Sequence, residues 1–210
     1  MIKKSSHSPQ YPSTLIDLIR HGEPAGGDKY RGSLDDPLSP TGWGQMRGAV
    51  GDHNPWDSLI TSPLLRCREF AQEVSHKHAL PLKIDPRFQE MSFGDWEGKT
   101  GEELMERDRE RLTRFWKNPL DNPPPGGEHL LDLEKRVGAA WEEMIQDNLD
   151  KHLLLVAHGG VIRMILSLVM ATPLIHLSRW TVPYAGLTRI RVDQVEETTM
   201  PRLIFHCGAL

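Results

Sequence analysis

The sequence has few of the features that would place it in a special class of protein. Only two cysteines, Cys67 and Cys207, occur among its 210 residues, so a disulfide framework is excluded and a reducing compartment is expected. The longest apolar run, residues 161–171, contains Arg163 and is far shorter than the roughly 20 residues that span a bilayer. Residues 1–11 are polar and lack the apolar segment of a secretory signal. These absences predict a soluble, cytoplasmic protein.

An excess of positive charge is also absent. Lys and Arg number 25 against 29 Asp and Glu, which gives a net charge of −4. This balance predicts no general affinity for nucleic acid or for an anionic membrane, so any bound anion would need a local cluster of cations. Hydrophobic residues make up 38% and charged residues 26%, an ordinary ratio for a globular protein. We expect a flexible tail over residues 1–13 and a single domain over residues 14–210.

Strand and helix patterns alternate along the chain. Short apolar runs bounded by turn residues predict strands over residues 14–19, 57–61, 82–84, 151–157, 188–192 and 202–206. Apolar residues at helical spacing predict helices over residues 40–51, from Ser62 and Pro63 onward, and over 101–117, 130–145 and 161–170. The alternation predicts an α/β fold, a three-layer α/β/α sandwich with a mostly parallel central sheet and one antiparallel edge strand. Such sheets bind ligands at the carboxyl ends of their strands.

Histidine and arginine residues follow three of the predicted strands. Arg20 and His21 end the first strand, Arg66 lies in the helix after the second, and His158 and Gly159 follow the most apolar strand. A single histidine in such a place is more often a hydrogen-bonded structural residue, and a single arginine is usually a surface cation. The coincidence of all four side chains at one sheet edge favours a shared function.

Four potential cations at one edge predict a bound anion. Without an obvious carboxylate partner, they would repel one another. Guanidinium groups fork onto phosphate oxygens, and Arg66 lies near a helix N-terminus, which also favours an anion. A neutral imidazole can act as a nucleophile. We therefore interpret this edge as a phosphate pocket with a histidine positioned to attack phosphorus.

Five segments, in this order, resemble the histidine phosphatase superfamily, which is also called phosphoglycerate mutase-like. They are Leu18-Ile-Arg-His-Gly-Glu-Pro24, Thr61-Ser-Pro-Leu-Leu-Arg-Cys67, Gln89-Glu-Met-Ser-Phe-Gly-Asp-Trp-Glu-Gly98, Pro125-Gly-Gly-Glu128 and Val156-Ala-His-Gly-Gly160. The resemblance covers about residues 14–193. It implies a phosphoglycerate mutase-like fold and a small-molecule phosphate ester as the partner, with no cofactor and no metal.

The resemblance also implies a role for each residue at the sheet edge. His21 would be the nucleophile and would pass through a phosphohistidine. Arg20, Arg66 and His158 would bind the phosphoryl oxygens. Glu90 would protonate the leaving oxygen and then deprotonate water, which is work worth roughly 10²–10⁴-fold in rate.

Further positions are implied near the mouth of the pocket. Gly159 would let the backbone approach the phosphate, and Arg31 and Gly32 fall in the family's first loop, where they would bind substrate. Glu23 is the second candidate for the acid. Many members carry an Asn a few residues after the nucleophile, where this chain has Pro24-Ala-Gly-Gly-Asp28, so one phosphate contact has no assigned residue.

Within the superfamily, the sequence is most similar to the α-ribazole phosphatases of cobalamin synthesis. The similarity lies in Arg31-Gly-Ser-Leu-Asp-Asp-Pro-Leu38, Phe93-Gly-Asp-Trp-Glu97 and Pro124-Pro-Gly-Gly-Glu128. A broad-specificity phosphatase of sugar or organic-acid phosphates, a phosphoglycerate mutase and a non-catalytic phospho-ligand binder are the alternatives. The short stretch between Glu90 and His158 favours hydrolysis over the mutase reaction, because mutases usually carry a longer insertion there.

The charged stretch 99–127 predicts a lid. It ends in prolines and contains Phe115 and Trp116, which could offer an aromatic face to a planar base or could instead form the core face of their helix. The sequence makes no prediction of the oligomeric state.

Overall fold

A computed structural model describes residues 12–210. The tail expected over residues 1–13 lies outside the described residues except for its last two positions, and Ser13 is already the first residue of strand β1. None of the helices within residues 12–210 is long and apolar enough to cross a membrane.

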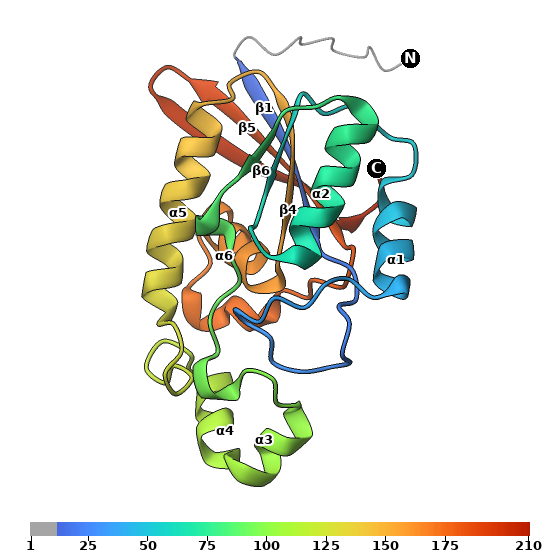
Figure 1. Ribbon diagram of the computed structural model, residues 1–210. Helices are drawn as coiled ribbons and strands as arrows, with labels where there is room; N and C mark the ends of the chain where they lie inside the picture. Colours follow the sequence, from blue (N-terminus) through green and yellow to red (C-terminus); the bar gives the residue numbers. More distant parts are fainter. Residues whose placement is uncertain (1–11) are drawn as a thin grey trace, which may run out of the picture.

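The centre of the fold is a six-stranded sheet in the order β3-β2-β4-β1-β5-β6 (Figure 1). The strands are β1 (Ser13–Arg20), β2 (Ser58–Thr61), β3 (Leu82–Ile84), β4 (His152–Ala157), β5 (Leu187–Val195) and β6 (Thr198–Gly208). Strands β1 to β4 pair in parallel, whereas β5 pairs antiparallel with both β1 and β6. The predicted α/β fold is confirmed, and its antiparallel pairing lies at one edge of the sheet, with β6 outside β5.

Helices cover both faces of this sheet. The α-helices of the described residues are α1 (Pro40–Val50), α2 (Leu65–His78), α3 (Gly101–Arg107), α4 (Arg109–Lys117), α5 (Leu130–Gln146) and α6 (Gly159–Val169), and the short 3₁₀ helices are η1 (Pro86–Phe88), η2 (Gly94–Trp96) and η3 (Leu174–Arg179). Figure 1 shows α1 and α2 on one side of the sheet and α5 and α6 on the other. The predicted three layers are therefore present.

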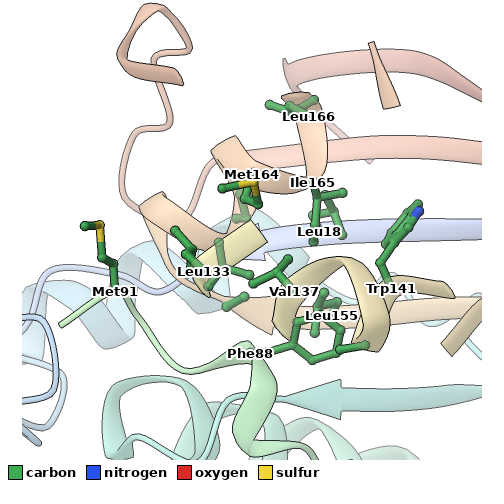
Figure 2. Packing of buried hydrophobic residues seen from close by; sticks show 14 of the residues in the cluster. Leu18, Phe88, Met91, Leu133, Val137, Trp141, Leu155, Met164, Ile165 and Leu166 are labelled. Carbon is green, nitrogen blue, oxygen red and sulfur yellow. The ribbon is translucent and has the colours of Figure 1, made fainter. Parts of the chain in front are cut away.

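Two buried clusters hold these layers together. Neighbouring residues on a strand point to opposite faces, so Leu18 packs in the cluster under α5 and α6, whereas Ile19 packs in the cluster under α1 and α2. Figure 2 shows the larger cluster, where Val137 of α5 and Ile165 of α6 lie against Leu18 and Leu155 of the sheet. Strands β1 and β4, the two central strands, are thus buried on both faces, which explains their continuous apolar runs.

Helix α2 begins later than the sequence predicts. Ser62 and Pro63 were expected at the cap and first turn, but the helix starts at Leu65, and the preceding Leu64 provides no side-chain cap. The Ser62 hydroxyl is instead 2.6 Å from the Nε2 atom of His158. The same hydroxyl also accepts a 3.3 Å hydrogen bond from the Leu64 N–H, so Ser62 connects the turn before α2 to a distant strand end. Ser39 caps α1, and its hydroxyl accepts a hydrogen bond from the Gly42 N–H.

The helical structure predicted over residues 101–117 is confirmed, but Asp108 divides it into two helices, α3 and α4. Asp108 ends α3 with φ −142° and ψ 35°, outside the helical region. Its carboxylate accepts a 3.0 Å hydrogen bond from the indole N–H of Trp96. Figure 1 shows this helix pair beyond the end of the sheet at which β1 and β4 terminate.

Candidate active site

His21 and His158 lie next to each other at the carboxyl ends of two paired strands. The register pairs Arg20 of β1 with Ala157 of β4, so the residue after each strand reaches the same point of the rim. The two imidazole centroids are 5.2 Å apart, and the side chains are 4% and 0% exposed. The sequence prediction that these two histidines converge is confirmed by this geometry.

The His21 ring is oriented for attack by its Nε2 atom. Nδ1 is 2.7 Å from the carbonyl oxygen of Gly22. A carbonyl can only accept, so Nδ1 carries the proton and Nε2 keeps its lone pair. Burial, together with Arg66 and Arg20 nearby, holds the pKa of His21 well below its ordinary value. The imidazole is therefore neutral near pH 7, as a nucleophile requires.

His158 is more deeply buried and is held by Ser62. Burial and the charge of Arg66 keep the pKa of His158 well below its ordinary value. The Cys67 sulfur is 3.6 Å from its Nε2 atom, and burial raises the pKa of that thiol, which keeps it protonated. Cys67 is thus the buried thiol that its place on the apolar helix face predicts.

Two arginines from different elements have buried guanidinium nitrogens at the rim. Arg20 Nη1 donates to the Val182 carbonyl at 2.6 Å, and its guanidinium carbon is 4.2 Å from the centroid of the Tyr184 ring. Arg66, which is 1% exposed, donates from Nη2 to the Gly32 carbonyl at 2.9 Å. The Nε atom of each arginine is buried and finds no hydrogen-bond partner within residues 12–210.

Such unsatisfied donors are costly, by roughly 1–3 kcal/mol each and more for charged groups. An oxyanion between the two arginines would satisfy them and balance their charge. The rim therefore fits the phosphate that the sequence pattern predicts. No three His, Cys, Asp or Glu side chains gather in the described part of the chain as a metal-binding group.

The Glu90 carboxylate reaches the same site from an irregular segment. One oxygen accepts from the Met91 N–H at 3.0 Å, and the other accepts from the Gly160 N–H at 3.1 Å. Gly160 lies in the first turn of α6, so a helix N-terminus faces the carboxylate. A Cβ at position 160 would stand 2.3 Å from Glu90 Oε1, so only glycine leaves room for this arrangement.

Arg31 and Gly32 are in the predicted loop, but they act differently from the rim arginines. Arg31 donates to Asp36 at 3.1 Å and to the Ala25 carbonyl at 2.8 Å, so its guanidinium ties the loop together. Gly32 contributes its carbonyl oxygen to Arg66. Glu23, the second candidate for the acid, accepts a hydrogen bond from the Ser39 hydroxyl and does not line the cavity.

A cavity of about 350 Å³ opens over this cluster. Its lining includes Arg20, His21, Arg31, Arg66, Glu90, Gly159 and Trp116, so it joins the rim to the outer helices. His158 is completely buried and meets this space only through its ring contact with His21. A second, apolar cavity of about 120 Å³ adjoins it and shares Glu90, Phe93, Trp116 and Arg163 as walls.

Arg163 and Tyr184 are lining residues that the sequence analysis did not assign to the site. Arg163, on α6, borders both cavities and donates from Nε to the Trp180 carbonyl at 2.8 Å. Its signal was an arginine in an otherwise apolar helix that directly follows a site histidine. Tyr184 lies before β5 with its ring centroid 5.8 Å from that of His21, and no local pattern marked it.

Comparison with known proteins agrees with this geometry. A family model described as "Histidine phosphatase superfamily (branch 1)" matches residues 16–200. A protein of Hydrogenobacter thermophilus named "Putative phosphoserine phosphatase 2" is 30% identical over 185 residues, which are 86% of this chain and 91% of that one. The adenosylcobalamin/alpha-ribazole phosphatase of Salmonella typhimurium is 32% identical over 184 residues, which are 84% and 85% of the two chains.

A solved structure named "Mycobacterial hydrolase 2" has the same fold, with a TM-score of 0.84 at 22% identity over 94% of this chain and 92% of that one. The family match covers most of the chain and includes all five motif segments. Together with the paired histidines and unsatisfied arginines of the rim, it shows that this protein belongs to the histidine phosphatase superfamily and is a phosphoric monoester hydrolase.

Proposed function

We propose that the protein hydrolyses phosphate monoesters in two steps through a phosphohistidine on Nε2 of His21. In the first step, Nε2 attacks phosphorus, the bond to the ester oxygen breaks, and Glu90 gives that oxygen a proton. In the second step, Glu90 takes a proton from water, and the oxygen of that water displaces Nε2 to release inorganic phosphate. The Nδ1 hydrogen bond of His21, which leaves Nε2 unprotonated, is the observation that carries this proposal.

The charge of the transferring group is balanced by the rim. Arg20 and Arg66 each have a buried Nε without a partner among the described residues, and His158 lies beside the nucleophile. These donors are fixed before substrate binds, so they stabilise developing charge without reorganising. No resident metal is needed for this mechanism, and we expect activity to survive treatment with EDTA.

For the substrate, we propose α-ribazole 5′-phosphate, in a cytoplasmic enzyme. The Trp116 side chain is 53% exposed and borders both cavities, where its ring could lie against a planar base. Phe115 also borders the second cavity, but it is 7% exposed and packs edge-on against Trp96, so the exposed ring of Trp116 is the better placed of the predicted aromatic pair. The similarity to the Salmonella enzyme also supports this choice.

A phosphorylated organic acid is the second candidate. Arg163 places a further guanidinium between the two cavities, where its charge could pair with a carboxylate on the leaving group. The relative described as a phosphoserine phosphatase is consistent with such a substrate. We further propose that residues 99–127 act as a lid, because Gly101 and Trp116 from this stretch line the 350 Å³ cavity over the rim.

Trapping the phosphoenzyme tests the mechanism. After rapid quenching with ³²P-labelled substrate, the wild-type enzyme should carry label that is stable to base and labile to acid. His21→Ala should carry none and should lose about 10⁴-fold or more of its kcat, because the remaining contacts cannot replace a covalent step. His76→Ala, which removes an exposed histidine, is the control. Stoichiometric label on His21→Ala would overturn the assignment.

Steady-state kinetics on four substrates test specificity. We expect the highest kcat/KM for α-ribazole 5′-phosphate, followed by phosphoserine, 3-phosphoglycerate and fructose 2,6-bisphosphate. A ranking led by phosphoserine or 3-phosphoglycerate would replace the α-ribazole proposal with the organic-acid one. Neither ranking affects the phosphohistidine mechanism.

A further inference from the structure

Glu90 lies on a part of the chain without regular structure of its own. Residues 89–93 run between η1 and η2 and belong to neither a helix nor a strand. We call residues 87–92 the acid segment. A general acid must be held to within a fraction of an ångström of the oxygen that it protonates, and irregular backbone does not provide that by itself. Contacts from other parts of the chain therefore have to fix the position of this segment.

A single guanidinium from α5 binds three carbonyl oxygens of the acid segment. Arg136 Nη1 donates to the carbonyls of Arg87 and Gln89, at 2.7 Å each. Its Nη2 donates to the carbonyl of Glu90 itself at 3.3 Å. The fork of one arginine thus spans the backbone on the N-terminal side of Glu90 and reaches the residue that carries the carboxylate.

Glu128 completes the arrangement from the other side. Its two carboxylate oxygens accept from Nε and Nη2 of Arg136 at 2.6 and 2.7 Å. Its own N–H donates to the Ser92 carbonyl at 2.9 Å, on the C-terminal side of Glu90. The side chains of Arg136 and Glu128 are only 24% and 17% exposed, so water screens the pair little. Through Glu128, the motif Pro125-Gly-Gly-Glu128 therefore contacts the backbone on one side of Glu90 and the arginine that binds it on the other.

We propose that Arg136 and Glu128 are positioning residues that hold the Glu90 carboxylate where it can protonate the leaving oxygen. This inference rests on the acid role given to Glu90 above. Neither side chain lines the cavity, so both act through the acid segment and not on the substrate. Loss of the fork lets the segment shift, and a displacement of about 1 Å can cost on the order of 10²-fold in rate.

The test is the dependence of kcat/KM on the leaving group, since kcat/KM reports the steps up to transfer of the phosphoryl group. Arg136→Lys keeps the positive charge near His158 but cannot fork onto three carbonyls. We expect kcat/KM for glycerol 2-phosphate, which has a poor leaving group, to fall about 10- to 100-fold. For p-nitrophenyl phosphate, whose leaving group needs little protonation, we expect a change below about threefold. Glu128→Gln should give the same pattern more weakly.

A matched control exists on the same helix. Glu143 of α5 accepts from Nη1 of Arg87 at 2.8 Å, so it also ties α5 to the acid segment, but through a side chain at the surface and away from Glu90. Glu143→Gln should lower kcat/KM for both substrates by less than about twofold. Thermal unfolding of every variant separates loss of fold from loss of positioning.

A double-variant cycle tests whether Arg136 acts through Glu90. If Arg136 acts through Glu90, the leaving-group effect of Arg136→Lys should disappear in the Glu90→Gln background. An equal loss on both substrates in Arg136→Lys, or a leaving-group effect that persists without Glu90, would overturn the positioning role and leave the phosphohistidine mechanism standing. Absence of any leaving-group effect in Glu90→Gln would overturn the acid role of Glu90 and this inference together. Trapping of phosphoenzyme on His21 would still report on the mechanism separately.

Discussion

The cations at the rim of the sheet, Arg20 and Arg66, and those at the mouth of the cavity, Lys29 and Arg31, differ in their ion pairing. At the rim, Arg66 is buried and Arg20 is half-buried, and each keeps a buried Nε atom that has no hydrogen-bond partner among the described residues. At the mouth, Lys29 and Arg31 both bind the carboxylate of Asp36, at 2.8 and 3.1 Å. The rim cations therefore still lack a counter-charge, whereas the two mouth cations already share the single carboxylate of Asp36.

The two regions also differ in what holds them. His21 and His158 follow strands whose register is set by backbone pairing, and both are almost fully buried. The mouth is built from residues 24–38, which are irregular, and from α3 and α4, where Trp116 stays half exposed. In the proposed mechanism, the chemistry common to every substrate thus lies on rigid strand ends, and we propose that the loops at the mouth select the substrate.

The largest difference between the two regions should appear when one arginine is removed from each. Arg66→Ala should lower kcat/KM for p-nitrophenyl phosphate by about 10³-fold or more, because a charged oxyanion loses a buried donor. Arg31→Ala should lower it by less than about tenfold, because its guanidinium is committed to Asp36 and to loop carbonyls. Comparable losses in the two variants would mean that Arg31 binds the transferring phosphoryl group directly.

A smaller effect, on the KM for one kind of substrate, should follow from removing an aromatic side chain at the mouth. Trp116→Ala should raise the KM for a nucleoside-like monophosphate about tenfold through the loss of an aromatic contact. It should change KM for p-nitrophenyl phosphate by less than about threefold, and kcat for either substrate little. Trp43→Ala, at a partly buried tryptophan beside Phe70 and away from the cavity, is the control. A matching rise in KM in the control would assign the effect to general loosening of the fold.

The smallest expected effect is a change in the free energy of unfolding with pH, which arises from the two histidines at the rim. Burial holds the pKa values of His21 and His158 well below the unfolded value of about 6.5. The unfolded chain therefore binds more protons, so the free energy of unfolding should fall as the pH drops below about 6.5 and should be steady above it.

Urea unfolding at pH 7.5 and pH 5.5 measures this difference. The buried Asp17 carboxylate does not interfere in that range, because its hydrogen bonds to His152, Arg189 and Trp56 lower its pKa to about 2. Its contribution is lost only below the unfolded value of about 3.9. Inorganic phosphate should reduce the loss at pH 5.5, since an anion at the rim favours protonated imidazole. An unchanged free energy between the two pH values would contradict the buried neutral state of the histidines.

Much of the site followed from the sequence because the rule behind it is local. A parallel strand delivers the residue after it to one edge of the sheet, so Arg20, His21 and His158 could be placed together from their positions after apolar runs. Helix α5 followed from apolar spacing for the same reason, since burial repeats along an element at a fixed period, and α6 followed from its nearly continuous apolar composition. The family resemblance then identified Glu90, which no local pattern distinguishes from a surface carboxylate.

Only the tertiary structure decided how side chains from separate segments satisfy one another. Ser62 contacts His158 as well as the Leu64 N–H before α2, Arg31 pairs with Asp36 of its own loop, and Glu90 is held by Gly160 and Arg136. Such pairings depend on where irregular segments meet after the layers have packed. Periodicity records which face of an element is buried, but it carries no information on which donor lies opposite which acceptor across two loops, and that is what assembles this site.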